Sequence, residues 1–266
     1  MSLSSIRKHF LIFGIQLKNN WVREAIYRTN FLTSGLIDLI WMVVEASLFT
    51  AIYTHVPVLA GWTKPQVFFF LGVFFAADAL FTTFCSRNFW MFPDLVTRGE
   101  LDIILTKPAN TFILAMTRAM SLTTLFNIVL GFIVMARYGT EAGFTGGAKW
   151  LLVLFWILIG FATQVLIRFA FCVWVFWTDR GFSLAMLYYK LFTLATKPDG
   201  LYPTALRYTI LTVLPFGFIG SVPARALMQG LRPVEYATVA AVLIGFSTMN
   251  FILWKEGLKR YQSASS

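Results

Sequence analysis

The chain has 266 residues, of which 58% are hydrophobic and only 13% charged, and its mean hydropathy is +0.71. Soluble domains are about a quarter charged, so this composition excludes an ordinary water-soluble domain and predicts a membrane protein. The net charge of +10 comes from cations that flank apolar runs, which is typical of membrane anchoring rather than of nucleic-acid binding. Cys85 and Cys172 lie in apolar runs, and they predict neither a disulfide framework nor a metal site.

The first segment, residues 5–29, is too polar to span a membrane. Apolar residues recur at helical spacing from Ile6 to Ala25, while cations such as Lys18 and Arg23 fall largely elsewhere. This pattern predicts an amphipathic helix that lies in the membrane interface, and the alternative is an ordinary packed cytosolic helix. The same polar residues interrupt the apolar run, so we expect no cleavable signal peptide.

Six apolar segments follow, and we expect each to cross the membrane, because a spanning helix needs about 20 residues. They cover residues 31–54, 66–86, 111–136, 149–177, 182–197 and 234–254. Asn110 directly precedes the third segment and has a side chain suited to a helix N-cap. The sequence therefore predicts an all-α polytopic membrane protein, with residues 1–266 forming a single transmembrane domain.

Two arrangements remain open for the region before the last segment, because Pro215 interrupts an apolar stretch there. In the first, 182–197 is the fifth span, and a re-entrant or half-buried pair of helices follows it. In the second, residues 178–204 stay on the cytoplasmic side, and residues 205–223 form the fifth span. Both arrangements give six crossings.

The positions of Lys and Arg predict the orientation. If the N-terminus lies inside, most cations outside the spans also lie inside, so both termini are expected in the cytoplasm. Residues 87–110 then form the only substantial cytoplasmic loop between spans. Its sequence predicts one or two short helices broken near Gly99 and at Lys107-Pro108. Such a loop either offers charged side chains to a partner or simply connects two spans.

This loop contains the sequence GELDIILTKP, and a Pro-containing apolar segment, LPFGFIGSVPARALMQG, precedes the last span. With the expected interfacial helix and six spans, these features resemble the type-2 permeases of ABC exporters. The resemblance is to the branch that carries a G-E-L-D-x-x-L-x-x-P motif in the loop after the second span, and it covers nearly the whole chain. Lys107 stands where many relatives have Arg, so a cation is retained.

The resemblance implies a permease of the bacterial plasma (inner) membrane that docks on separate ABC ATPase subunits. It would pair with a second copy of itself or with a different permease. Residues 201–229 would form an outer re-entrant segment of short helices. The ATPase would contact the loop through Asp94, Arg98, Gly99, Glu100, Leu101, Asp102, Leu105, Lys107 and Pro108.

No part of the chain matches the G-x-x-x-x-G-K-[ST] phosphate-binding motif, so ATP hydrolysis is expected on a partner chain that binds Mg-ATP, and this chain is expected to need no cofactor and to have no catalytic residues. A secondary transporter or channel without an ATPase is the main alternative. A membrane-embedded enzyme is less favoured, because the acidic residues are scattered rather than clustered. The sequence does not specify the substrate.

Charged residues within the expected spans are costly in lipid and therefore informative. Five of them fall seven to nine positions from the inner end of a span, at about the same depth of roughly 10–14 Å. These five are Asp38, Asp78, Arg118, Arg168 and Lys190, with Glu45 one heptad beyond Asp38. We expect a charged layer in which Asp38 and Asp78 pair with two of the three cations, with Gln164 nearby. Such a layer would either fix helix packing or form a cytoplasmic gate.

Overall fold

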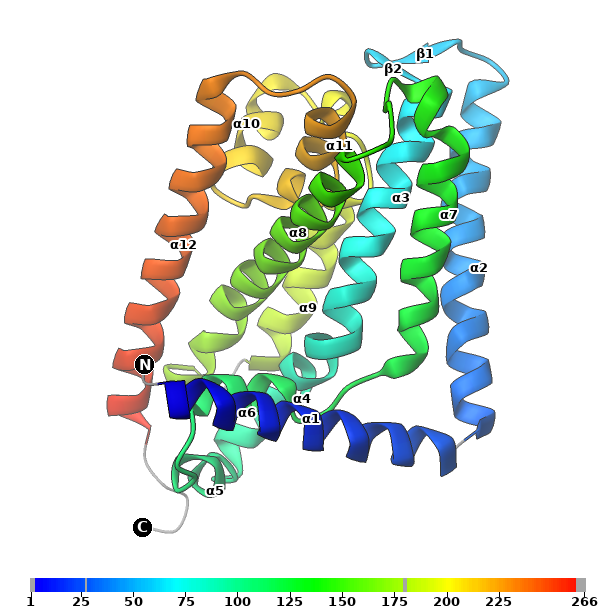
Figure 1. The fold of residues 1–266 in the computed structure, drawn as a ribbon. Helices are drawn as coiled ribbons and strands as arrows, with labels where there is room; N and C mark the ends of the chain where they lie inside the picture. Colours follow the sequence, from blue (N-terminus) through cyan, green and yellow to red (C-terminus); the bar gives the residue numbers. More distant parts are fainter. Residues whose placement is uncertain (1–2, 27, 179–180, 262–266) are drawn as a thin grey trace.

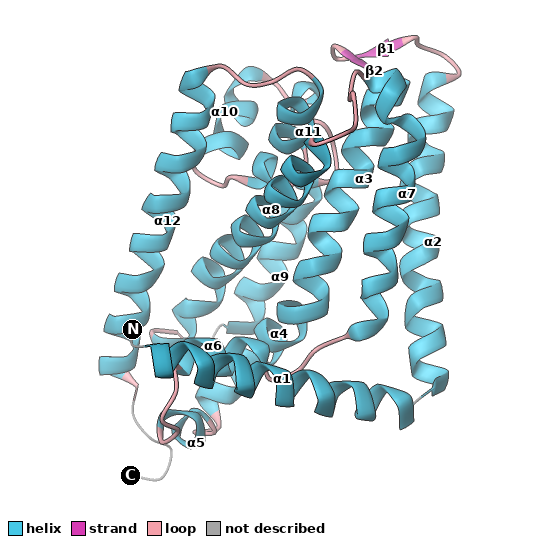
Figure 2. Cartoon of the chain, in the orientation of Figure 1, coloured by secondary structure: helices cyan, strands magenta, loops and turns pink. Residues whose placement is uncertain are grey.

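The computed structural model describes residues 3–26, 28–178 and 181–261, and almost all of them are helical (Figure 1, Figure 2). Among these residues the only strands are β1 (Val58–Leu59) and β2 (Trp62–Thr63), which form a small antiparallel hairpin between two helices. The expected all-α polytopic architecture is confirmed.

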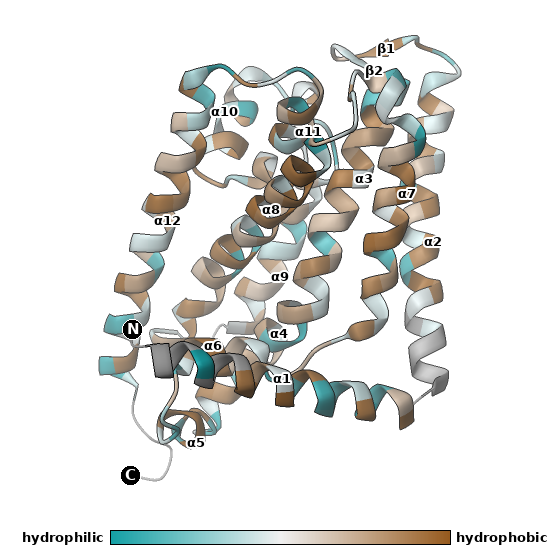
Figure 3. Ribbon diagram, viewed as in Figure 1, coloured by the Kyte–Doolittle hydropathy of each residue, from teal (hydrophilic) through white to brown (hydrophobic). Residues whose placement is uncertain are grey.

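Six helices form the main bundle. They are α2 (Arg28–Tyr53), α3 (Lys64–Phe81), α7 (Leu125–Ala142), α8 (Lys149–Cys172), α9 (Gly181–Phe192) and α12 (Pro233–Arg260). Within the described residues, five helical segments are long and apolar enough to cross a membrane, and hydrophobic residues are distributed along their lengths (Figure 3). The helix α9 is not among them: its 12 residues extend only about 18 Å, against a hydrocarbon core of about 30 Å. The count of six crossings therefore stays a prediction.

Helix α3 lies at the centre of the bundle. In its most apolar window 78% of the residues are buried, against 17% for α2 and 11% for α12. Phe69, Phe70 and Phe74 on α3 are almost completely buried, and α3 packs mainly against α7 and α8. A helix that is hydrophobic on all sides has to be enclosed by other helices or by lipid. The outer helices instead leave large apolar side chains exposed, as expected of surfaces that face lipid.

The contact between α3 and α7 is unusually close, because each helix has a glycine at the crossing. A Cβ atom placed on Gly131 would lie 2.7 Å from the carbonyl oxygen of Gly72, and one on Gly72 would lie 2.8 Å from the carbonyl oxygen of Gly131. The two backbones therefore touch directly. Small residues at such crossings are a common way for membrane helices to gain van der Waals contact.

Several short helices lie at one end of the bundle. Helix α1 (Leu3–Ile26) runs across this end at a steep angle to the long helices, and α4 (Arg87–Thr97), α5 (Leu101–Leu105) and α6 (Thr111–Thr117) lie beside it (Figure 1). Helix α12 also ends there. The predicted N-terminal helix is thus present, and its steep angle is consistent with an interfacial position, which remains a prediction.

The third expected span needs correction. The sequence predicts one helix over 111–136, but the chain leaves the helix after α6 and resumes in the 3-10 turn Leu122–Thr124 and α7, which continues to Ala142. The N-cap prediction is confirmed, because the Asn110 side chain accepts a hydrogen bond from the Ile113 N–H at 3.1 Å. The break arises from tertiary contacts that supply the missing hydrogen bonds, as described below.

The region before α12 bears on the second of the two arrangements considered above. Residues 205–223 do not form one helix: α10 (Thr204–Thr212), the 3-10 turn Phe216–Phe218 and α11 (Ser221–Met228) are separate elements interrupted at Pro215. They lie at the end of the bundle opposite α5 (Figure 1). The arrangement with a fifth span at 205–223 is therefore wrong, because proline lacks the N–H that a continuous helix requires.

The glycine contact leads to a first prediction. Gly131→Ala should lower the stability of the protein by about 1–3 kcal/mol, because the new methyl group would force α3 and α7 apart. Gly245→Ala is the matched control: Gly245 is a helical glycine of α12 with no atom within 4 Å of an added Cβ, so alanine should stabilise it by about 0.5–1 kcal/mol. Thermal unfolding in detergent micelles distinguishes the two, and equal midpoints would contradict the close contact.

Candidate functional site

The first part of the predicted cytoplasmic loop 87–110 continues a long helix. Helix α3 continues through the π-helical turn Thr82–Ser86 into α4, so residues Lys64–Thr97 form one continuous helical segment. Pro93 interrupts the hydrogen bonds inside α4, which leaves the Phe89 carbonyl without its usual helical donor. The Cys172 thiol of α8 donates to this carbonyl at 3.7 Å. The buried thiol therefore serves to bind α4 to α8.

Gly99 determines where α4 ends. Its φ of +74° lies in the left-handed region, which an L side chain adopts only with strain. The Arg98 N–H still donates to the Asp94 carbonyl at 2.9 Å, and α5 begins directly after Glu100. The predicted breaks near Gly99 and at Lys107-Pro108 are both confirmed, since α5 ends at Leu105.

Helix α5 has two distinct faces. Leu101 is fully buried and Ile104 is 5% exposed, whereas Ile103 is 64% exposed and Leu105 39%. The buried pair belongs to an apolar cluster at this end of the molecule, which we call the α5-end cluster. It consists of Phe81, Cys85, Phe89, Phe92, Leu95, Val96, Leu101, Ile104, Leu114, Ala115, Met116, Phe169, Cys172, Val173, Val175 and Phe176. Trp254 and Leu258 of α12 pack against it, so the cluster links α5 to the ends of α8 and α12.

The structure separates the nine predicted coupling residues by exposure. Leu101 is buried and serves as an anchor, and Gly99 and Asp102 are half-buried. The other six are exposed: Asp94, Arg98, Glu100, Leu105, Lys107 and Pro108. Sequence reasoning missed Ile103, the most exposed apolar residue of α5. The i, i+3 spacing of Leu101 and Ile104 could have indicated that Ile103 points the other way.

The exposed charges of the loop are only loosely held. Asp94 and Arg98 approach to 3.9 Å with both side chains about 70% exposed, so this ion pair contributes little. Asp102 is different, because it lies beside Tyr261 at the end of α12. Burial and the neighbouring Asp102 carboxylate raise the pKa of the Tyr261 hydroxyl. This contact is a second link between the loop and α12.

Two shallow cavities of about 100 Å³ and 120 Å³ flank the loop. Glu100 and Arg118 line both of them, with Asp94 and Arg98 in one and Ile103 and Lys107 in the other. Small-molecule sites usually occupy about 300 Å³ or more. These cavities instead have the size of individual side chains. They make the surface uneven and charged, as a docking surface for a protein can be.

The chain between α6 and α7 is held by side chains on both of its sides. On α4, the Asn88 amide donates to the Ala119 carbonyl at 2.7 Å and accepts from the Ala119 N–H at 2.8 Å. On α1, the Asn20 amide accepts from the Met120 N–H at 3.0 Å and donates to the Arg118 carbonyl at 3.2 Å. These two amides supply the backbone hydrogen bonds that a continuous helix would otherwise have made.

Further contacts complete this connection. Glu24 of α1 accepts from the Leu122 N–H at 2.8 Å, and the carbonyl of Thr83 in the π turn accepts from the Ser121 N–H at 2.9 Å. The Thr83 and Thr124 hydroxyls hydrogen-bond at 2.6 Å. Helix α1 is therefore joined to the rest of the site by specific hydrogen bonds, which the sequence did not reveal.

The expected charged layer is not formed. Arg118 follows the short α6 at the α5 end and is exposed, and Lys190 is exposed on α9. No ion pair within 4.0 Å joins Asp38 or Asp78 to Arg118, Arg168 or Lys190, all of which belong to the described residues. The expectation was wrong because it placed Arg118 inside a continuous third span and assumed that all five side chains point inward.

The carboxylates on α2 instead have partners elsewhere. Asp38 accepts a hydrogen bond from the Asn127 amide of α7 at 3.0 Å. Glu45 is buried and forms an ion pair with Lys197 at 2.8 Å, and the Lys197 ammonium also lies 5.3 Å from the centre of the Phe49 ring. The two contacts bind α2 to α7 and to the turn after α9. Each charge is thus stabilised locally rather than in a common layer.

Arg168 of α8 is fully buried among aromatic rings. Its guanidinium lies 4.4 Å from the centre of the Tyr189 ring, 4.5 Å from that of Tyr188 and 5.1 Å from that of Trp90. It donates one hydrogen bond, to the Ala185 carbonyl at 3.2 Å. In the described chain its Nε and Nη2 atoms, and both side-chain polar atoms of Gln164 one turn away, have no protein partner. The Arg168 guanidinium is therefore stabilised by cation–π contacts instead of by the carboxylate partner that the sequence analysis predicted.

These features define the chain as a multi-pass, all-helical membrane protein with an exposed, charged loop at one end. A family model described as ABC-2 family transporter protein matches residues 39–265. The chain therefore belongs to this family of ABC transporters and is a transmembrane permease. The comparisons with curated proteins and with solved structures return no match.

The hydrogen bonds between α1 and the chain after α6 give a second prediction. Asn20→Ala should lower stability by about 1–3 kcal/mol, because the buried Met120 N–H would lose its acceptor. The neighbouring Asn19 is exposed, so Asn19→Ala should change stability by less than about 0.5 kcal/mol. Denaturation in micelles measures both. Equal changes in the two variants would mean that the hydrogen bonds of the Asn20 side chain contribute nothing to stability.

The aromatic cage around Arg168 gives a third prediction. Arg168→Ala should lower stability by about 2 kcal/mol or more, because three rings would lose a desolvated cation and face a cavity. Lys190→Ala removes an exposed cation from α9 and should leave the unfolding midpoint almost unchanged. An Arg168→Ala protein as stable as the unaltered chain would show that the ring contacts contribute nothing.

Proposed function

We propose that the chain is the permease subunit of an ATP-driven exporter, that it forms half of a translocation path, and that it couples to a separate ABC ATPase through the surface around α5. The α5 end would face the cytoplasm of a bacterial cell, and the path would be completed by a second copy or by a different permease. Membership of the ABC-2 family supports this proposal, as does the lack of a phosphate-binding motif in the chain.

The observation that carries the proposal is the two-faced packing of α5. Its outward face exposes Ile103 and Leu105 next to the charges of Glu100 and Lys107. A surface of mixed apolar and charged groups is typical of protein interfaces. Its inward face, through Leu101 and Ile104, is anchored in the α5-end cluster.

Force applied to α5 would reach the spanning helices by two routes. The first is the continuous helical segment that runs from α4 through the π turn into the central helix α3. The second is the α5-end cluster, which links α5 to the ends of α8 and α12. Closure of two ATPases around nucleotide would move the loop, and the permease would then shift between inward-open and outward-open states.

A site-specific cross-link tests the docking surface. Cys85 and Cys172 are buried, so a cysteine introduced by Ile103→Cys should be the only readily accessible thiol. In native membranes, a thiol-reactive photo-cross-linker at this position should link the permease to a protein that carries the P-loop motif. Val58→Cys, an exposed position at the opposite end, is the matched control and should give no such product.

The same preparations provide a functional measurement. Glu100→Lys should reduce the amount of ATPase that co-purifies with the tagged permease by about tenfold, the effect of roughly 1.4 kcal/mol in binding. Glu256→Lys reverses another exposed charge near the same end and should not. If position 103 reacts with membrane-impermeant reagents from outside the cell, or cross-links to no ATPase, the proposal fails.

A further inference from the structure

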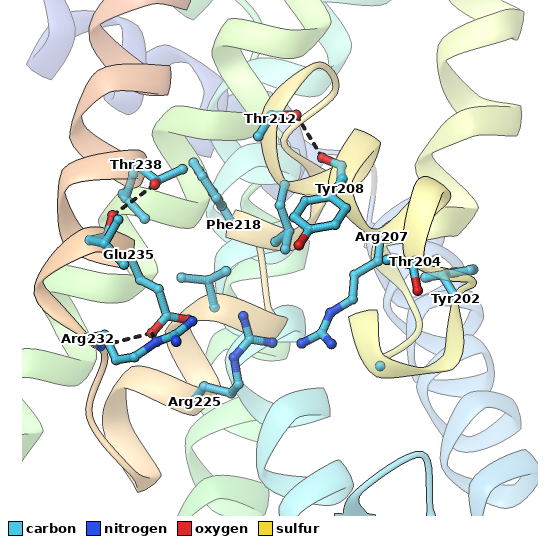
Figure 4. Close-up of a pocket in the computed structure, with 15 residues that line it drawn as sticks. Tyr202, Thr204, Arg207, Tyr208, Thr212, Phe218, Arg225, Arg232, Glu235 and Thr238 are labelled. Carbon is cyan, nitrogen blue, oxygen red and sulfur yellow. Dashed lines mark hydrogen bonds and ion pairs between the residues drawn. The ribbon is translucent and has the colours of Figure 1, made fainter.

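A larger pocket lies at the end of the bundle opposite α5. Its volume is about 550 Å³, and it is lined by residues of α10, α11 and the first turns of α12 (Figure 4). Known small-molecule sites range from about 300 to 1,000 Å³, so the pocket is large enough for a ligand. None of the residues considered so far for ATPase docking lines it.

A buried carboxylate organises one wall of this pocket. Asp199 is fully buried and forms ion pairs with Arg207, at 3.0 Å, and with Arg225. The Asp199 N–H donates to the Ser221 hydroxyl at 3.0 Å, which holds the turn before α10 against α11. Figure 4 shows the two guanidinium groups facing one another in the pocket. One carboxylate therefore holds two like charges close together.

The other charges of the pocket do not neutralise this excess. Arg232 and Glu235, at the start of α12, pair with each other at 3.4 Å. Three arginines then face two carboxylates, which leaves one net positive charge. Among the hydrogen bonds of the described residues, the Arg225 side chain makes only the one that runs from Nη1 to Asp199. The pocket thus retains directed donors and an unbalanced cation.

The remaining lining has two characters. Tyr202, Thr204 and Tyr208 add hydroxyl groups on the side of the arginines, and Figure 4 shows the Tyr208 hydroxyl directed towards them. Apolar side chains complete the wall: Leu211, Phe218, Val222, Val234 and Val239. A cationic, hydroxyl-rich part and an apolar part therefore share one cavity.

We propose that this pocket binds the phosphate group of an anionic amphiphile, with the phosphate at Arg207, Arg225 and Arg232 and the apolar part against Leu211 and Phe218. The planar donor fork of arginine matches the oxygens of a phosphate, which suits two adjacent guanidinium groups. The phosphate of the ligand supplies the negative charge that balances the third arginine of the pocket. A neutral amphiphile would leave the excess charge unbalanced, and a free anion would leave the apolar wall unused.

The proposal does not rest on ATPase coupling, because binding is measured on the purified permease without nucleotide. The permease is held in neutral maltoside micelles and titrated calorimetrically with three probes. These are dihexanoyl phosphatidate, dihexanoyl phosphatidylcholine and inorganic phosphate. Phosphatidate should bind at least about tenfold more tightly than either of the others, because only it combines the uncompensated anion with acyl chains.

Variants locate the site. Arg232→Gln and Tyr208→Phe change exposed side chains, so both proteins should fold, and each should weaken phosphatidate binding by about threefold to tenfold. Arg225→Gln should weaken it further. The matched control is Arg137→Gln, which removes an arginine from another exposed intrahelical ion pair, Arg137–Glu141 of α7, outside the pocket, and should change binding by less than about twofold.

Three results would overturn the proposal. Equal binding of phosphatidylcholine would mean that the acyl chains alone are recognised. Equal binding of inorganic phosphate would mean that the site takes a free anion rather than an amphiphile. Unchanged phosphatidate binding in both Arg232→Gln and Tyr208→Phe would place the ligand elsewhere on the protein.

Discussion

The direct backbone contact between α3 and α7 is the constraint on which the rest of the structure depends. Because Gly72 and Gly131 lack side chains, α7 can approach close enough to help enclose the central helix. The apolar residues on all sides of α3 are then buried by neighbouring helices rather than left to lipid. Since α3 continues into α4, the element that forms the core of the bundle also carries the exposed loop at its end. Packing in the middle of the molecule and the position of the candidate site are therefore linked.

A second constraint is that backbone polar groups shielded from water must find partners. The chain leaves the helix at residues 118–121, where Asn20 and Asn88 replace the missing hydrogen bonds from two sides. The π turn contributes as well, because its Thr83 carbonyl accepts a hydrogen bond from the Ser121 N–H. This explains why α1 lies across the end of the bundle: it holds the α6–α7 connection in place. A helix read as a membrane anchor thus also has a structural role.

The charges within the bundle show several solutions to one problem, the cost of a charge away from water. Glu45 has a direct ion pair with Lys197, Asp38 has an amide partner, and Arg168 has three aromatic rings. At the end opposite α5, Asp199 is shared by two arginines, which leaves a positive charge for a ligand to balance. The two ends of the molecule therefore differ in character. One has an exposed surface of mixed apolar and charged groups, and the other has a cationic pocket.

The sequence by itself determined the membrane class, the N-terminal helix, the breaks at Gly99 and Pro108 and the N-cap at Asn110, because hydropathy, φ requirements and capping act locally. The loop motif also indicated the ABC permease family. Only the tertiary structure decided the break at residues 118–121, the partners of the internal charges, and which face of α5 is exposed. These depend on contacts between residues 100 or more positions apart in the chain, such as Asn20 with Met120 and Glu45 with Lys197, and local sequence patterns carry no signal for them.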